Sequence, residues 1–194
     1  MTIARIDTRT RLLDVAAGRF LEDGYVETSV RSIAEAMGIK AGSIYYHFDS
    51  KDEILAEVLD RGIELISRSV DEALEGATDS RDRLERAVRA HLRALFEHGA
   101  YTACHVRVFH QAPPDVQRRT TVARDRYEAR WTELLDEAFD AGALREGVDL
   151  ALARLFLLGA LNAAVEWFGD DGRSVEQVAS TFSTLFLDGA LRGE

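Results

Sequence analysis

Side chains suited to binding another molecule are concentrated between positions 28 and 53 of the chain. Each of them can donate a hydrogen bond, and they are Arg31, Lys40, Ser43, Tyr45, Tyr46, His47 and Lys51. Donors of this kind bind phosphate oxygens and the acceptor edges of bases. The stretch therefore indicates contact with nucleic acid.

Two short helices joined by a glycine-containing turn are expected to position these donors. The first spans about 30–37, with Ser29 as its cap and Gly38 as its end. The second spans about 43–48, where Ile44 and Phe48 lie one turn apart and are expected to point inward. The remaining side chains of this second helix then point outward, which is how a recognition helix presents its face to the major groove.

Two further features favour phosphate binding next to this helix. Gly42 has no side chain, so the backbone can approach a phosphate closely. Lys51 falls in the first turn of a long helix predicted over 51–75, whose N-terminal dipole suits an anion. A capping box of Ser50 and Glu53 marks the start of that helix.

The stretch resembles the TetR family of transcriptional regulators. The matching segments are Thr28-Ser29-Val30-Arg31-Ser32-Ile33-Ala34 and Gly38-Ile39-Lys40-Ala41-Gly42-Ser43-Ile44-Tyr45-Tyr46-His47-Phe48-Asp49-Ser50-Lys51-Asp52-Glu53-Ile54-Leu55. Ile44 and Ile54 replace the commoner leucine. The resemblance implies a repressor that binds palindromic operator DNA as a dimer and is released by a small-molecule effector.

The resemblance also assigns roles to single residues. Arg31, Lys40 and Ser43 would contact bases or the nearby backbone, and Tyr45, Tyr46, His47 and Lys51 would hold phosphates, with Ala41 and Gly42 in the same DNA-binding set. Alternatives stay open for several of them. Tyr45 or Tyr46 could be a half-buried packing residue, Lys51 a solvated lysine, and Arg31 the partner of Glu35 at i,i+4. Arg5 and Arg9 could form a flexible arm or a solvated tail.

The rest of the chain predicts an all-α fold with about nine helices, divided into domains 1–50 and 51–194. A first helix covers about 7–23, and further helices follow the one at 51–75. Asp115 is placed to cap the seventh helix, and Ser174 with Gln177 forms a capping box at the start of the last. Residues 150–168 are apolar almost all round, which suits a helix buried on nearly every side. The last two helices are therefore predicted to form a homodimer interface, the alternative being ordinary core helices of a monomer.

By the family resemblance, an effector cavity lies within 51–194. Polar and aromatic side chains on otherwise apolar stretches are its candidate walls: His91, Cys104, His105, Phe109, Tyr127, Trp131, Asn162 and Glu166. Asn162 needs a polar partner in its apolar surroundings, either a ligand or a neighbouring side chain. Trp167-Phe168 followed by Gly169-Asp170-Asp171-Gly172 is similar to members that sense acyl-thioesters, although 155–168 holds no arginine for a coenzyme phosphate.

Composition limits the other possibilities. The net charge is −10, but residues 1–51 carry seven basic and seven acidic side chains, so only this part is suited to DNA. The single Cys104 excludes an internal disulfide. The sequence shows no signal peptide and no apolar run of roughly 18 residues, so the chain is expected to be cytoplasmic and not in a membrane.

No catalytic or metal-binding pattern is evident, so the chain is not expected to be an enzyme or to need a cofactor. His105 and His110 are five positions apart and do not share a helix face. No Gly-rich phosphate loop or nucleophile elbow occurs. The remaining alternative is a helical dimer that acts as an interaction module and no longer binds DNA.

Overall fold

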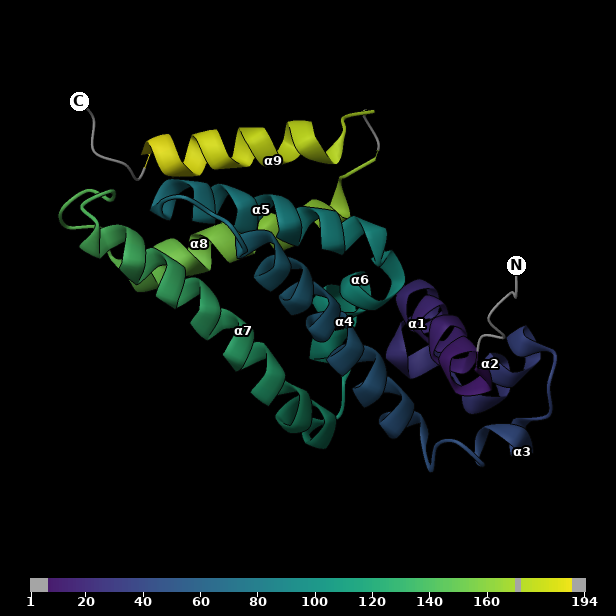
Figure 1. Ribbon diagram of the computed structural model, residues 1–194. Helices are drawn as coiled ribbons and strands as arrows, with labels where there is room; N and C mark the ends of the chain where they lie inside the picture. Colours follow the sequence, from purple (N-terminus) through teal and green to yellow (C-terminus); the bar gives the residue numbers. More distant parts are fainter. Residues whose placement is uncertain (1–6, 170–171, 190–194) are drawn as a thin grey trace. The chain divides into compact units, whose positions relative to one another are not determined.

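The computed structural model describes residues 7–169 and 172–189, which are almost entirely helical (Figure 1). In chain order the helices are α1 (Thr8–Glu27), α2 (Val30–Met37), α3 (Ala41–Ile44), α4 (Lys51–Leu74), α5 (Ser80–Glu97), α6 (Gly99–Val108), α7 (Pro114–Asp140), α8 (Leu150–Ala163) and α9 (Val175–Ser183). Short helical turns extend three of them: η1 (Phe109–Gln111), η2 (Ala164–Glu166) and η3 (Thr184–Asp188). The all-α prediction, with nine α-helices over the described ranges, is confirmed.

The chain folds into two compact units. Unit 1 contains residues up to Ile63 together with His98–Ala123, and unit 2 contains Glu64–Glu97 and the residues from Arg124 onward. Helices α4 and α7 each contribute to both units. This division by packing differs from the predicted domains 1–50 and 51–194, which separate the chain by function and stay a prediction.

The core of unit 1 forms where α1 meets α6 and α2. The apolar face of α1 is fully buried, with Leu12, Ala16 and Phe20 each at 0% exposure. Helix α4 approaches α6 closely at Gly62, where an added Cβ would lie 2.5 Å from the carbonyl oxygen of Tyr101. A glycine is therefore required at this helix crossing.

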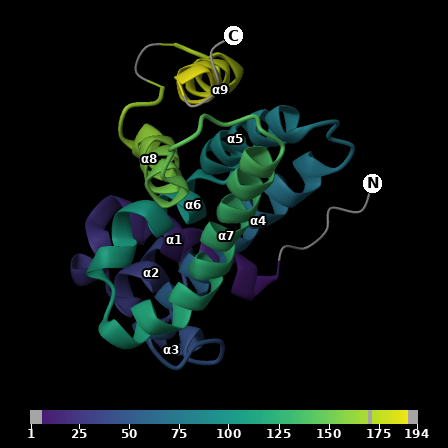
Figure 2. The same cartoon turned by 90° about the vertical axis from the view of Figure 1, so that its left-hand side faces the viewer.

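In unit 2, α5 packs against both α8 and α9, and both views place α9 alongside α5 (Figures 1 and 2). Leu84, Val88 and Leu92 on α5 are buried, as are Leu161 on α8 and Val178 on α9. No helix in the described part of the chain combines the length and apolar character needed to cross a membrane.

Most predicted helix ends are confirmed by local geometry. Ser29 accepts from the Ser32 N–H in a capping box, and Gly38 ends α2 with φ 71°. Ser174 and Gln177 form the expected box at α9. The second helix of the DNA-binding pair is shorter than predicted and covers Ala41–Ile44, with a turn after it in which the Phe48 N–H donates to the Ile44 carbonyl at 3.1 Å.

The prediction that Asp115 caps the seventh helix is wrong. Helix α7 already begins at Pro114, and Asp115 lies in its first turn, where its carboxylate pairs with Arg118. Proline is favoured at the first helical position, since it lacks the N–H that would have no partner there. The signal for the helix start was therefore the proline itself.

Candidate DNA-binding surface and effector site

The segment α2–α3 holds its polar side chains outward by burying two apolar ones. Ile44 is 0% and Phe48 2% exposed, whereas Tyr45 is 56% and Tyr46 88% exposed. The predicted inward and outward faces are thus confirmed for these four residues. Such exposure argues against a packing role for the two tyrosines, whose hydroxyls are accessible to a ligand.

The other predicted DNA contacts lie on the same short segment. Lys40 and Gly42 are exposed, and Ala41, Ser43 and His47 are half-buried. All five belong to the turn before α3 or to α3 and the turn that follows it. The segment therefore presents hydroxyl, imidazole and ammonium groups within eight consecutive positions.

Arg31 lies one helix earlier and makes the alternative contact considered above. Its Nε donates to Oε1 of Glu35 over 2.8 Å on the exposed side of α2. An exposed ion pair of this kind is screened by solvent and contributes little to stability, so a phosphate or base can replace it readily.

Lys51 has a role that neither sequence interpretation anticipated. Its Nζ donates to the carbonyl oxygens of Tyr25 and Thr28, at 2.9 Å each, and lies 4.0 Å from the centre of the Tyr25 ring. The ammonium group thus satisfies carbonyls at the end of α1. Sequence spacing could not reveal this contact, because it joins residues more than 20 positions apart.

Arg9 is part of a helix and has defined partners. Its guanidinium pairs with both carboxylate oxygens of Glu57 on α4 and lies 4.8 Å from the centre of the Phe48 ring. It is therefore neither a flexible arm nor a solvated tail, and it connects α1 with α4. Arg5 lies outside the described residues.

In unit 2, three of the predicted effector-site residues form one buried aromatic cluster. Nδ1 of His91 lies 2.7 Å from the Tyr127 hydroxyl, and the Trp131 ring stands edge-on to His91 with centroids 6.0 Å apart. His91 and Trp131 are 1% and 0% exposed. Burial lowers the pKa of His91 to about 4, so the imidazole is neutral near pH 7.

Two polar atoms of this cluster have no well-formed hydrogen bond to any residue in 7–169 or 172–189: His91 Nε2 and Trp131 Nε1. Asn162 lies close enough to His91 to favour the protonated ring slightly, and Trp131 lies close enough to the Tyr127 hydroxyl to favour its ionised form slightly, but neither pair has the alignment of a good hydrogen bond. Buried donors without partners are rare in folded proteins. The cluster thus has capacity for one more polar group.

Three of the other predicted effector-site residues belong to unit 1 and not to unit 2. Cys104, His105 and Phe109 belong to α6 and η1 in unit 1, where His105 Nδ1 lies 3.2 Å from the Leu59 carbonyl oxygen. Cys104 is fully buried there. Glu166, in η2 of unit 2, is exposed.

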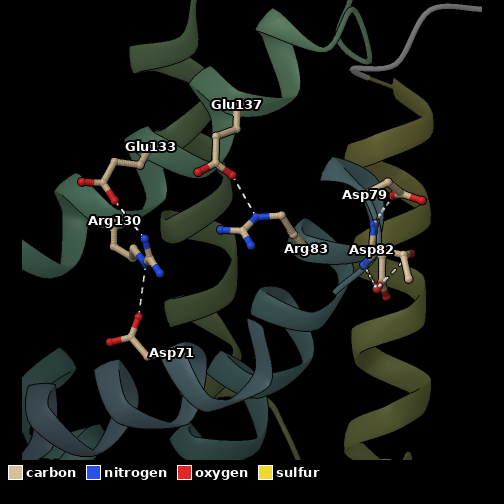
Figure 3. Close-up of polar contacts among 8 residues, drawn as sticks. Asp71, Asp79, Asp82, Arg83, Arg130, Glu133 and Glu137 are labelled. Atoms are coloured by element: carbon tan, nitrogen blue, oxygen red, sulfur yellow. Dashed lines mark hydrogen bonds and ion pairs between the residues drawn. The ribbon is translucent and has the colours of Figure 1, made fainter. Parts of the chain in front are cut away.

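A hollow of about 360 Å³ in unit 2 was missed by the sequence reasoning. Its walls come from α4 and α7, and they are Ser67, Asp71, Arg126, Tyr127, Arg130 and Glu133. Figure 3 shows Arg130 between two carboxylates, with 3.1 Å to Asp71 and 3.0 Å to Glu133. Tyr127 belongs to both the hollow and the buried cluster, so it connects them. Charged residues on helix surfaces follow no distinctive period, which is why no sequence signal marked this hollow.

An apolar face on α8 is exposed in the single chain. Leu152, Leu155 and Phe156 are 57–70% exposed, although large apolar side chains are normally covered when they lie together. Leu155 and Phe156 follow Leu152 by three and four positions, so both lie on the side of the helix that Leu152 occupies, and Gly159 extends this side. Phe156 stacks against Phe186 of η3 with ring centroids 6.3 Å apart, but all three side chains remain more than half exposed to solvent.

Two family profiles match the chain. The one described as "Bacterial regulatory proteins, tetR family" matches residues 12–58, and "Tetracyclin repressor-like, C-terminal domain" matches residues 77–190. The chain belongs to the TetR family. It is accordingly a transcriptional regulator, and the resemblance drawn from residues 28–55 is confirmed.

Relatives of this TetR-family protein span nearly its whole length. The HTH-type transcriptional repressor KstR2 of Rhodococcus jostii is 32% identical over 97% of this chain and 93% of its own. Among solved structures, the TetR family regulator PfmR of Thermus thermophilus has a TM-score of 0.83 and 34% identity, covering 94% of this chain and all of that one. AibR in complex with isovaleryl coenzyme A and operator DNA has a TM-score of 0.83 at 21% identity, covering 92% and 97%, and shares the fold.

Proposed function

We propose that this TetR-family protein binds operator DNA as a homodimer and is released by a small-molecule effector of the acyl-thioester class. The observation that carries the DNA-binding part is the pattern around α3. Ile44 and Phe48 are buried, while Tyr45 and Tyr46 are turned to solvent beside the exposed Lys40. A face of hydrogen-bond donors held on a rigid base suits the major groove and its phosphates.

The exposed face of α8 supports dimerisation. Leu152, Leu155 and Phe156 would leave water if a second copy packed against them, and small Gly159 lets two helix backbones approach closely. Burying apolar area stabilises association by about 25 cal/mol per Å² before the entropic cost of assembly. A two-fold dimer would also present two reading heads to the two halves of a palindromic operator.

The buried cluster of unit 2 supports an effector that brings its own acceptor. His91 Nε2 and Trp131 Nε1 have no well-formed hydrogen bond to the described residues, and Tyr127 joins them to the hollow lined by Arg126 and Arg130. A carbonyl oxygen would suit such donors, and the guanidinium of Arg126 would suit an anionic end, since that of Arg130 already pairs with Asp71 and Glu133. AibR, which has the same fold, was crystallised with an acyl thioester of coenzyme A and with operator DNA.

Fluorescence anisotropy with duplexes from the region upstream of the protein's own gene tests the proposal. We expect a saturable complex, and Tyr46→Ala should weaken it roughly 5- to 30-fold, about 1–2 kcal/mol for one hydrogen bond to a charged phosphate. The loss should be similar on an unrelated duplex, since a phosphate contact carries no sequence information.

Val122→Ala is the matched control, since Val122 is an exposed residue of α7, 64% accessible, outside α2 and α3. It should bind as the unmodified protein does. Absence of binding to any neighbouring intergenic duplex at low salt would favour the interaction-module alternative instead. Loss of operator discrimination in Tyr46→Ala would show that Tyr46 reads bases.

A further inference from the structure

A kink near the end of α1 leaves a backbone donor without a helical partner. Gly24 has φ 80° and ψ 167°, so the helical hydrogen-bond pattern is interrupted there. The N–H of Tyr25 instead donates to Oε1 of Gln111, at 3.1 Å, across 86 positions of sequence. The partner belongs to η1, the turn that follows α6.

The same tyrosine is held on two other sides by the start of α4. Its hydroxyl donates to Asp52, and its carbonyl oxygen accepts from Lys51 Nζ at 2.9 Å. The Lys51 ammonium also lies 4.0 Å above the Tyr25 ring. Burial, and then the bond to Asp52, raise the pKa of the Tyr25 hydroxyl, so it stays protonated and remains a donor.

We name Tyr25, Lys51, Asp52 and Gln111 the Tyr25 clasp. It joins three elements of unit 1: the end of α1, the first turn of α4, and η1. The α2–α3 segment is the stretch of chain between the first two of these elements. Its two ends are therefore fixed by the same residue, and Gln111 fixes that residue to η1.

The glycine at position 24 fits this arrangement on two counts. Its positive φ is rarely adopted by other residues, and an added Cβ would lie 3.0 Å from Gln111 Oε1. The backbone and the amide of Gln111 are thus in close contact, and a side chain at position 24 would require the Gln111 amide to shift. This is a close-fitting contact, and it is made by an otherwise exposed glutamine.

We propose that Gln111 and Tyr25 are positioning residues for DNA binding: the hydrogen bond between them helps to set the orientation of α2 and α3, and neither residue contacts DNA itself. The inference rests on the proposed operator binding. It also gives Lys51 a second task, since its Nζ holds the Tyr25 and Thr28 carbonyls whether or not a phosphate approaches. A shift of η1 would be passed to the reading head through one hydrogen bond.

The test uses two glutamines in the full-length protein. Gln111→Ala removes the acceptor of the Tyr25 N–H, whereas Gln111→Glu retains it. Gln117 provides matched controls, because its Nε2 donates to the Ala112 carbonyl close by in sequence and it is not a member of the clasp. Gln117→Ala therefore removes an amide, and Gln117→Glu adds the same charge as Gln111→Glu. Neither substitution removes a residue of the clasp.

Three readouts are taken for each variant: hydrogen exchange of the Tyr25 amide, the melting temperature, and operator affinity over a salt series. For Gln111→Ala we expect at least roughly fivefold faster exchange at Tyr25 and roughly fivefold weaker operator binding, as one lost hydrogen bond predicts. The salt slope should not change, since no phosphate contact is removed. Gln111→Glu should match Gln117→Glu in affinity, and Gln117→Ala should match the unmodified protein.

Wild-type operator affinity in Gln111→Ala, despite faster exchange at Tyr25, would overturn the positioning role. Unchanged exchange at Tyr25 would overturn it as well, because the clasp would then not depend on Gln111. The positioning role would also be overturned if Gln111→Ala and Gln111→Glu lost operator affinity equally, each compared with the same substitution at Gln117. If the unmodified protein binds no duplex, the proposed function falls together with this inference.

Discussion

The hydroxyl of Tyr127 on α7 lies 2.7 Å from Nδ1 of His91 on α5, in a part of unit 2 that solvent scarcely reaches. The imidazole is neutral because charging it there would sacrifice its hydration. The carboxylates that line the neighbouring hollow, Asp71 and Glu133, are engaged by Arg130. The bond between His91 and Tyr127 therefore joins two helices through neutral groups. Because a proton on His91 would place a charge in this buried site, the stability of unit 2 should depend on pH.

Acid should destabilise the protein through His91. Its pKa is about 4 in the folded state, against roughly 6.5 in an unfolded chain. Between these values the unfolded state binds a proton that the native state does not, so stability falls as the pH drops from about 6.5 to 4 and the loss is complete below that. The full loss is ~3 kcal/mol in the free energy of unfolding.

Urea unfolding at several pH values measures this effect. His91→Gln should be less stable at pH 7 but should lose ~3 kcal/mol less than the unmodified protein between pH 6.5 and 4. His98→Gln is the control, because it removes an exposed histidine that is not part of the cluster of His91, Tyr127 and Trp131. Identical profiles for all three proteins would contradict the assignment to His91.

Local sequence signals predicted the fold well wherever the determining contacts were local. The Ser29 cap, the left-handed Gly38 and the Ser174–Gln177 box involve residues within a few positions of one another, and each is present. The inward direction of Ile44 and Phe48 followed from helical spacing alone.

Long-range contacts were not predictable in this way. Lys51 was assigned by analogy to phosphate, but its carbonyl partners lie at the end of α1, where the last carbonyls of a helix have no partner within the helix. The candidate effector residues were chosen for being polar on apolar stretches, a property shared by buried residues of both units. Composition cannot tell which core a polar residue joins, so Cys104 and His105 lie in unit 1 while His91 and Tyr127 lie in unit 2.

Substitution of Gly62 by alanine should destabilise unit 1. The new Cβ would lie 2.5 Å from the Tyr101 carbonyl oxygen, so α4 and α6 must move apart. We expect a loss of about 1–3 kcal/mol in the free energy of unfolding, as is typical of overpacking. Gly18→Ala is the control: it lies in α1 with nothing within 4 Å of its added Cβ, and should be neutral or stabilising by about 0.5–1 kcal/mol. Equal effects of the two substitutions would contradict the close crossing of α4 and α6.

Phe156→Glu should dissociate the proposed dimer. Phe156 is 70% exposed in the single chain, and a carboxylate at the centre of an apolar subunit interface would have to be buried without a partner. Sedimentation equilibrium should show a dimer for the unmodified protein and a dissociation constant raised at least roughly 100-fold in the variant, about 3 kcal/mol. Val122→Glu places the same charge on α7, at another exposed apolar residue, and should remain dimeric. A monomeric unmodified protein would exclude the interface.

Cys104 should resist thiol reagents as long as unit 1 is folded. It is the single cysteine of the chain, is fully buried on α6, and has its pKa raised by burial to about 12. Only the thiolate attacks a disulfide reagent, so at pH 8 both access and ionisation are suppressed. Reaction with an aromatic disulfide should therefore be slow in buffer and rapid in denaturant, and Gly62→Ala, which disturbs the packing of α6, should speed up the reaction in buffer. Stoichiometric modification of the native protein within the mixing time would show that α6 opens freely and that the buried position of Cys104 is wrong.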